Sequence, residues 1–403
     1  MPMKPTKFLL LLLLAIFAVV SSVAQMRGDK QEDYRFTDLI TIPTTDVKDQ
    51  HQTGTCWSFA GVSLLESEIV RQGGMAIELS PMFIVYHTYL EKADKFVRMH
   101  GKTNFSGGGA FHDVTNVVRK QGIVPYGVYT GLNYGEEKHS HGELEGMLSA
   151  QVESVVKNPN RKLTPVWRES IRKSLTTYLG EYPETFEYNG ESYTPVRFSR
   201  EVVGLNMDDY VELTSFTHHP FYEKFILEIP DNWSWDAVYN LPLDELMEVI
   251  DYALINGYSL GWAADVSERG FMSSNRGVAV VPARKTADMS DTELSRWEAL
   301  THRQQEDELY RQSGPLEEAE ITQEMRQLAF DNFQTTDDHG MHIIGLSRDQ
   351  DGNTFYKIKN SWGSYNLYNG YFYASRSYME YKTITFMLHK DGIPEHIRKK
   401  LDI

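Results

Sequence analysis

The sequence predicts an α+β fold, with a helix near the N-terminus and antiparallel strands near the C-terminus. Residues 56–73 carry apolar side chains at the three- to four-residue spacing of an amphipathic helix, and Gly73 supplies its stop. Much further along, the turn signals DQDG and NLYNG separate three short strand-like runs, 339–348, 353–362 and 370–375. A hydrophobic content of 41% and an aromatic content of 12% are typical of a chain with a packed core.

The first 24 residues are typical of a secretory signal peptide. Lys4 and Lys7 provide a basic start, the apolar run FLLLLLLAIFAVV follows, and small residues precede a cleavage site after Ala24. The apolar run is shorter than the ~20 residues that span a bilayer. We therefore expect residues 1–24 to be removed and residues 25–403 to be exported, periplasmic or secreted, without a membrane anchor.

Charge and histidine placement argue against two other classes of function. The formal net charge of −16 and a pI near 5.3 disfavour a nucleic-acid partner, because phosphate contacts need a basic face. His139, His141, His218 and His219 come in pairs, but the sequence around them lacks the ligand spacing of a metal site. We expect no metal and no cofactor.

Cys56 is the only cysteine of the chain, and its placement predicts a reactive thiol. It cannot form a disulfide within its own chain, and a free thiol is exposed to oxidation outside the cell. The expected helix begins at Cys56, so unpaired backbone amides and the helix dipole should lower its pKa. Gln50, six positions upstream, offers an amide donor for an oxyanion. An inert buried cysteine stays the alternative at this point, because a nucleophile also needs a base and a group that orients the base.

The strand pattern limits which histidine can be that base. Side chains alternate between the two faces of a strand, so His339 and His342 lie on opposite faces of the run 339–348. Only one of the two can therefore face a given site. In the run 353–362, Asn360 is the residue with a neutral amide side chain near the strand end.

Three segments, QHQTGTCWSFA, DHGMHIIGL and KIKNSWGSYNLYNGYF, together resemble the papain-like cysteine proteases, peptidase family C1. The resemblance implies that Cys56 is the nucleophile, His339 the base, and Asn360 the residue that orients it. It also implies that Gln50 holds the oxyanion and that Trp362 shields the histidine–asparagine hydrogen bond from water. These roles fit the chemistry, because imidazole exchanges protons near neutral pH and an amide orients it without titrating. The implied fold has two lobes, a helical left lobe with the nucleophile helix and an antiparallel, β-barrel-like right lobe.

The spacing of the segments points to one branch of that family. His339 follows Cys56 by 283 positions (339 minus 56), against about 130–150 in ordinary papain-like enzymes. The stretch FSGGGAFHDVTNVVRKQGIVPYGVY, among others, resembles the bleomycin hydrolase and aminopeptidase C branch. The extra length is expected as helical insertions in the peptidase domain at about 136–190 and 281–330.

Gly108 and Gly109 belong to a run of three glycines in that stretch. Such a run is most simply a flexible loop. Its position directly before AFHDVTNVV favours instead a backbone that pairs with an extended substrate, where a side chain would block the approach. We assign both glycines, together with Trp362, to substrate binding.

We expect an exported cysteine peptidase that acts on peptide substrates, preferably as an aminopeptidase of bleomycin-hydrolase type. In that branch a C-terminal arm enters the cleft, and its carboxylate receives the amine of the substrate. The present chain stops at Ile403, soon after PEHIRKKL, and a cleft without this arm would stay open beyond the first residues of the substrate. An endopeptidase with an open cleft is therefore the alternative, and a catalytically silent peptide-binding protein is a further one. The resembled branch is often hexameric, but the sequence itself does not support an oligomer.

Overall fold

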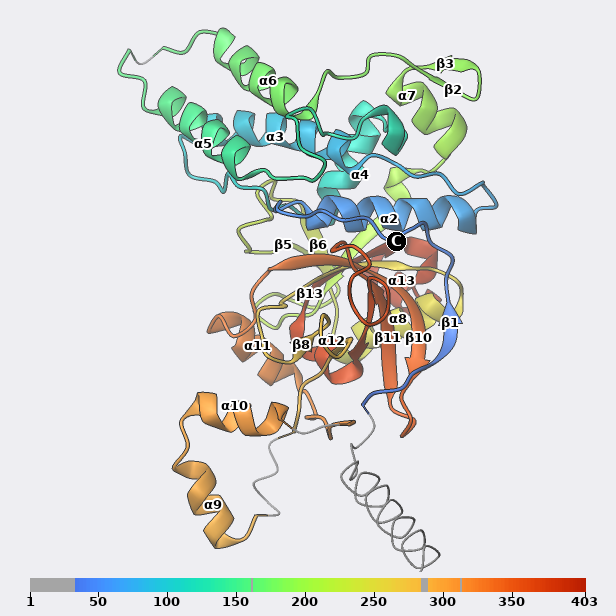
Figure 1. Ribbon diagram of the computed structural model, residues 1–403, viewed down its shortest axis with the longest axis vertical. Coiled ribbons are helices and arrows are strands. Elements are labelled where there is room, and N and C mark those ends of the chain that lie inside the picture. The colour runs from blue at the N-terminus through green and yellow to red at the C-terminus, as the bar shows by residue number, and fades with distance from the viewer. Residues whose placement is uncertain (1–32, 161, 284–288, 312–313) are drawn as a thin grey trace, which may run out of the picture.

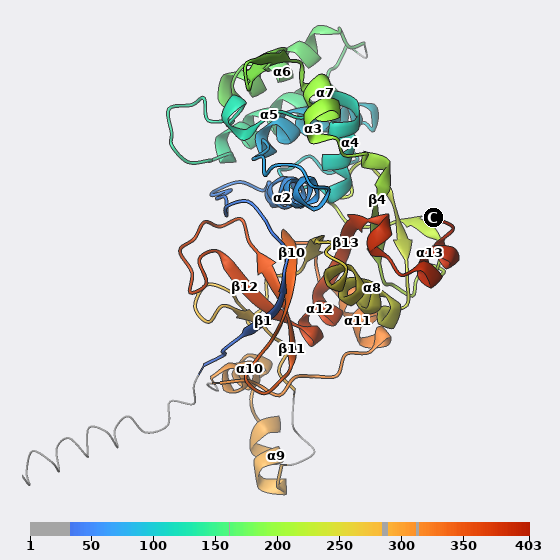
Figure 2. The ribbon, with the colours of Figure 1, turned by 90° about the vertical axis from the view of Figure 1, so that its right-hand side faces the viewer.

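A computed structural model describes residues 33–160, 162–283, 289–311 and 314–403. The expected signal peptide lies outside these residues. The chain forms two lobes, a helical one and one built around a large sheet, with helix α2 along their junction (Figures 1 and 2). The predicted two-lobed α+β fold is thereby confirmed. Among the described residues, no helix combines the length and apolar character needed to cross a membrane.

Helix α2 (Cys56–Arg71) is covered on every side. Every residue from Trp57 to Ile69 is buried, polar ones included. Helices α3 (Pro81–Arg98) and α4 (Phe111–Gln121) pack on it from one lobe, and strand β10 packs on it from the other. The predicted helix is present, although it is buried throughout rather than along one apolar stripe.

The insertion at about 136–190 enlarges the helical lobe at the end away from the sheet (Figure 1). Helices α5 (Gly142–Val156) and α6 (Val166–Leu179) pack on each other and on α3. Each helix buries apolar side chains four residues apart, the spacing of one helix face: Leu144, Leu148 and Val152 in α5, and Ile171, Leu175 and Leu179 in α6. The hairpin β2 (Phe186–Tyr188) and β3 (Glu191–Tyr193) follows, and then the short helix α7 (Pro195–Phe198).

The second lobe is an 11-stranded, mostly antiparallel sheet that curves around its own apolar core. Its strand order is β5-β6-β4-β13-β7-β10-β11-β12-β9-β8, and β1 pairs with β10. The strands are β1 (Thr37–Thr41), β4 (Tyr210–Thr214), β5 (Lys224–Ile226), β6 (Ala237–Asn240), β7 (Leu260–Ala264), β8 (Phe271–Met272), β9 (Val278–Ala279), β10 (His339–Arg348), β11 (Thr354–Lys359), β12 (Tyr371–Ser375) and β13 (Thr383–His389). Four helices lie beside the sheet: α8 (Leu243–Ile255), α11 (Gln323–Asp331), α12 (Arg376–Lys382) and α13 (Glu395–Leu401).

Helix α11, in the stretch 281–330 predicted to be an insertion, lies beside the sheet, whereas the earlier described part of the stretch lies at the opposite end of the molecule (Figure 1). This earlier part forms α9 (Asp291–Glu298) and α10 (His302–Tyr310). A capping box between Thr301 and Gln304 starts the second helix, which explains why this stretch is two helices. The first residues of the 136–190 stretch, by contrast, reach the loop before α2, where the backbone N–H of Gln52 donates to the His139 carbonyl and that of His141 donates to the Gln52 carbonyl, both at 3.1 Å.

The C-terminal strands carry the residues predicted to be functional. Strand β10 occupies the whole predicted run 339–348, whereas β11 ends at Lys359, earlier than predicted. Asn360 therefore lies just beyond the strand, where its backbone N–H donates to the Gly370 carbonyl at 3.0 Å. Gly352, in the turn between β10 and β11, has a φ of 87°, which favours glycine.

Candidate active site

The loop before α2 is tied to the segment that follows β11. The backbone N–H of Gln50 donates to the Ser361 carbonyl at 2.8 Å, and Asp49 forms an isolated bridge with Trp362. These bonds link two segments about 310 residues apart. They hold the start of α2, and with it Cys56, beside the end of β11.

Gly340 allows strand β10 to reach the start of α2. A Cβ at this position would lie 2.9 Å from the Cα of Trp57 and 3.1 Å from its backbone nitrogen. Glycine is therefore required by the close approach of two backbones. Because His339 precedes Gly340 and is the first residue of β10, this approach brings its imidazole to the nucleophile helix.

His339 is held by the two residues predicted to accompany it. Its Nε2 lies 2.8 Å from Oδ1 of Asn360, an oxygen that also accepts the backbone N–H of Ser361 at 2.8 Å. The indole of Trp362 stacks on the imidazole with ring centroids 4.6 Å apart and an interplanar angle of 26°. With Nε2 bonded to Asn360, Nδ1 is the ring nitrogen left to exchange a proton in the cavity.

Gln50 is buried and fixed by its side-chain amide. Its Nε2 donates to the Thr53 carbonyl at 2.8 Å, and its Oε1 accepts the hydroxyl of Ser361 at 2.6 Å. The first bond fixes which end of the amide is the donor, because a carbonyl oxygen can only accept, and an amide nitrogen carries two hydrogens. One N–H is therefore used by Thr53, and the other is the candidate oxyanion donor.

Burial sets the protonation states of Cys56 and His339. Desolvation, reinforced by the charges of Asp337 and Asp231, raises the pKa of the Cys56 thiol to about 12. Desolvation also lowers the pKa of His339 to about 4, although the bond to Asn360 acts in the opposite direction. The expected lowering of the thiol pKa by the helix start is wrong for the empty site, because burial and two carboxylates outweigh it. The resting pair is a neutral thiol and a neutral imidazole.

Cys56 and His339 line one cavity between the lobes. The walls near them include the backbone of Gly109 and the ring of Phe111. The remaining wall is acidic, with four carboxylates: Glu212, Asp231, Asp337 and Asp338. His112 lies among them, and its Nδ1 is 3.2 Å from Oε1 of Glu212.

The two glycines assigned to substrate binding have different surroundings. Gly109 lines the cavity and packs so tightly on Trp57 that a Cβ would lie 2.8 Å from the indole. A Cβ at Gly108 would instead overlap the Asp231 carboxylate, and the Gly108 carbonyl accepts a hydrogen bond from the ammonium of Lys92. The glycine run is thus packed against the chain itself, and Gly109 alone of the pair faces the cavity.

Comparison with known proteins fits this geometry. A model described as the Peptidase C1-like family matches residues 14–307 and 308–403. The chain belongs to this family. Aminopeptidase G of Lactobacillus delbrueckii subsp. lactis is 23% identical over 393 residues, which cover 87% of this chain and 82% of the relative. Aminopeptidase C of the same organism is 22% identical over 436 residues, which cover 96% and 90%.

The fold has a counterpart in the crystal structure of PepW from Lactobacillus rhamnosis. The two structures superpose with a TM-score of 0.67 at 20% sequence identity, over 100% of this chain and 95% of the other. Membership of the C1-like family makes the protein a cysteine-type peptidase. The family resemblance inferred from the motifs around Cys56, His339 and Asn360 is confirmed.

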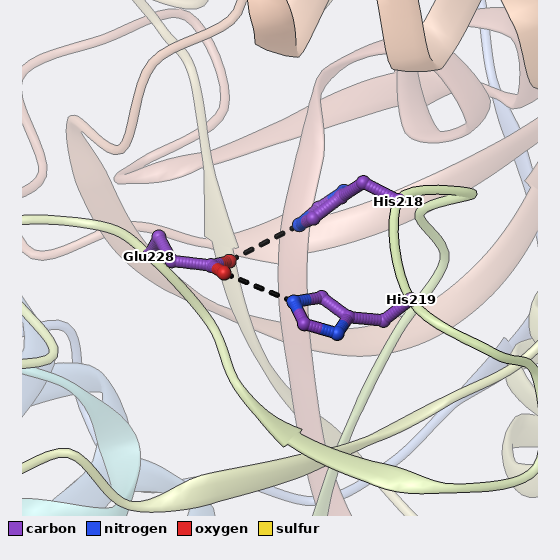
Figure 3. A group of neighbouring side chains, drawn as sticks. All are labelled: His218, His219 and Glu228. Atoms are coloured by element: carbon purple, nitrogen blue, oxygen red, sulfur yellow. Dashed lines mark hydrogen bonds and ion pairs between the residues drawn. The ribbon is translucent and has the colours of Figure 1, made fainter.

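Three other histidines of this C1-like peptidase, His342, His218 and His219, lie away from the Cys56 cavity. His342 is buried on the opposite face of β10, where its Nδ1 lies 2.9 Å from the Ser63 hydroxyl. Nε2 of His218 and Nε2 of His219 lie 3.1 and 2.9 Å from the two carboxylate oxygens of Glu228 (Figure 3). The sequence analysis missed this trio, because Glu228 joins the two histidines only through the fold. Its ligand atoms lie within 4.8 Å of one another and could hold a cation, but the same distances are those of ordinary hydrogen bonds at an exposed site.

Four further residues that shape the cavity were missed from the sequence. Ser361 fixes the amide of Gln50, and Gly340 sets the contact between β10 and α2. Each is the sequence neighbour of a predicted site residue, so its place in the sequence could have indicated a role in the site. Asp231 and Asp337 come from two separate loops, and only the folded chain shows that both line the cavity.

Proposed function

We propose that the protein is an exported aminopeptidase that removes N-terminal residues from peptides by a Cys–His–Asn mechanism. The observation that carries the proposal is the arrangement of Cys56 and His339 on one cavity, with His339 bonded to Asn360 and covered by Trp362. The basic and apolar character of residues 1–24 supports export. The relatives named aminopeptidase G and aminopeptidase C support the exopeptidase assignment.

In the proposed reaction, Sγ of Cys56 attacks the carbonyl carbon while Nδ1 of His339 takes the thiol proton. The carbonyl oxygen becomes an oxyanion, which the Cys56 backbone N–H and the free N–H of Gln50 stabilise. The C–N bond then breaks, and His339 gives its proton to the departing amine. Water attacks the resulting thioester with His339 as base, and the acid and the thiol are released. Because the resting pair is neutral, the thiolate forms as the new bond forms.

An endopeptidase is the second candidate, because the final helix lies outside the cavity. Helix α13 packs against α8, where Nζ of Lys400 lies 2.7 Å from Oε1 of Glu245. Among the described residues, none after Thr385 lines the cavity. The described residues after Thr385 therefore do not obstruct the cavity.

Two measurements test the proposal. Cys56→Ala should lose at least about 10³-fold in kcat/KM and all labelling by a thiol-directed epoxide, with an unchanged melting temperature. Hydrolysis retained in this variant would overturn the nucleophile assignment. The wild type should cleave unblocked peptides and leave their N-acetylated forms intact, whereas efficient cleavage of both would identify an endopeptidase.

A further inference from the structure

The aminopeptidase assignment requires a group that receives the substrate's amine. The chain up to Ile403 does not place its own terminus in the cavity. Ile403 packs beside the apolar core of the sheet lobe, next to α13. Among the described residues, the acidic side chains that line the cavity are the candidates for this group.

Asp231 lines the cavity and lies directly against the glycine run that was assigned to substrate binding. Nδ2 of Asn104 donates to its Oδ1 at 3.0 Å, which fixes the carboxylate against the bare Cα of Gly108. The carbonyl of Gly108 is occupied as well, by the buried ammonium of Lys92. An extended substrate cannot pair with Gly108 unless Asp231 moves. Asp231 therefore closes this end of the cleft.

Asp337 presents a second carboxylate in the same cavity. Within the described residues, its side chain makes no hydrogen bond or ion pair. Burial raises its pKa well above the usual range, and the charges of Asp231, Asp338 and Glu212 act in the same direction, while His112 opposes them. Asp337 is thus an acidic group without a local partner.

The neighbouring charged groups already have partners of their own. Glu212 accepts the backbone N–H of His112 at 2.7 Å and faces its imidazole. Asp338 accepts the Thr336 hydroxyl at 2.9 Å and the Val266 backbone N–H at 3.3 Å. A further carboxylate of this region, that of Asp113, accepts the Trp233 indole N–H at 2.8 Å and the Ala110 backbone N–H at 3.0 Å. The ammonium of Lys92 donates to the Gly108 and Ser106 carbonyls. Among the described residues of this wall, Asp337 is therefore the carboxylate without a hydrogen-bond partner, whereas Lys92 and Asn104 offset part of the negative charge of Asp231.

Two like charges in a partly dry cavity raise each other's energy, and a cation between them removes the repulsion. Because Cys56 lines the same cavity, the ligand that arrives there is a peptide whose carbonyl meets the thiol. In an unblocked peptide, the α-ammonium lies two bonds from the first carbonyl carbon. It is the one cation that every such substrate brings to this position.

We propose that Asp231 and Asp337 bind the α-ammonium of the substrate and that Asp231 closes the cleft beyond the first residue. The two carboxylates thereby restrict Cys56 to the first peptide bond. This assignment rests on the proposed aminopeptidase function. It gives the cleft an amine-binding group that comes from internal side chains of the chain.

The test compares Asp231→Asn and Asp337→Asn with the wild type on an aminoacyl fluorogenic amide and its N-acetyl form. Each substitution should lower kcat/KM for the free amine roughly 10- to 100-fold, mainly through KM, because a charge-assisted hydrogen bond is lost. Asp231→Gly should in addition gain cleavage of N-acetyl dipeptide amides, which a misfolded variant cannot do. The matched control is Asp208→Asn, an exposed carboxylate that pairs with Arg119 at 2.8 Å outside the cavity, and it should behave as the wild type.

Binding to the inactive Cys56→Ala protein separates this inference from the function on which it rests. In calorimetry, an unblocked dipeptide amide should bind at least about tenfold more tightly than its N-acetyl form, and Asp337→Asn should remove the difference. An unchanged preference in both Asn variants would overturn the amine site even if the protein is a peptidase. A wild type that hydrolyses no peptide but shows the preference would overturn the function and keep the site.

Discussion

At the catalytic end of the cavity, hydrogen bonds hold Gln50 and His339 in place, whereas at the acidic end, around Asp231 and Asp337, like charges lie close together. Gln50 and His339 are locked by hydrogen bonds to neighbouring residues, and burial keeps the thiol and the imidazole neutral. The charge of Asp231 instead raises the pKa of Asp337, and both carboxylates raise the pKa of the Cys56 thiol. The first arrangement is held by bonds within the protein, whereas the second needs a cation to offset its charge.

This difference separates preorganisation from recognition. A general base must hold one orientation before substrate arrives, so its bonds are best made within the protein. A group that distinguishes a charged from a blocked amine must leave its own charge uncompensated until the ligand binds. Such a site lowers stability in the free enzyme, which is a common cost of function.

The largest expected effect comes from the catalytic end. His339→Ala should lower kcat roughly 10²- to 10⁴-fold, the usual contribution of a general base, because no other group would take the thiol proton. The comparison is His342→Asn on the opposite face of β10, which should lose stability by thermal unfolding but keep kcat within a few-fold. Equal losses of kcat in the two variants would contradict the assignment of His339 as the base.

The catalytic end could be predicted from the sequence because its residues lie in short local segments. Cys56 begins a helix directly after a short loop, and Asn360 and Trp362 lie within the three positions that follow one strand. The helix at 56–73 and the strand at 339–348 were predicted with correct type for the same reason, since local periodicity determines them. The acidic end could not be predicted, because Asp231 and Asp337 meet only when two distant loops fold against the same cavity. The thiol pKa was predicted in the wrong direction for a related reason, since burial is a property of the fold.

Gly340→Val should cause a smaller loss of kcat. This variant tests the close backbone contact between β10 and α2. The added side chain cannot fit 2.9 Å from the Cα of Trp57, so β10 must move away from α2 and carry His339 with it. A displacement of about 1 Å can lower kcat about 100-fold. Gly352→Val, in the exposed β10–β11 turn, is the control for strain alone and should affect only stability. Normal kcat in Gly340→Val would show that the close approach is not needed.

Removing the charge of Asp337 at the acidic end should stabilise the protein, by an amount that depends on pH. The folded-state pKa of Asp337 is raised, so its ionised form disfavours the native state above the unfolded pKa, and the penalty disappears as pH falls through the folded pKa. Asp337→Asn should therefore raise the melting temperature at pH 8, by about 1–4 °C, and the gain should shrink at acidic pH. A constant gain at all pH values, or a loss at pH 8, would show that Asp337 has a compensating partner in the empty enzyme.

The smallest effect is expected at Trp362. Its ring covers His339 from water without touching the reacting atoms, and 39% of the residue is exposed. Trp362→Ala should lower kcat by roughly 3- to 10-fold through a weakened bond between His339 and Asn360. The ratio of free-amine to N-acetyl cleavage should not change, because the acidic end is untouched. A change in that ratio would mean that the indole contacts the substrate's amino end.

The acyl group that Cys56 carries during turnover tests both ends of the cavity at once. Wild-type enzyme is mixed with an unblocked peptide, quenched in acid within milliseconds, and its mass is measured intact and after digestion. We predict an adduct of a single amino-acid residue, located on Cys56 and absent from Cys56→Ala. An adduct of two or more residues, or one on any other side chain, would contradict the assignment of Cys56 as a nucleophile confined to the first peptide bond.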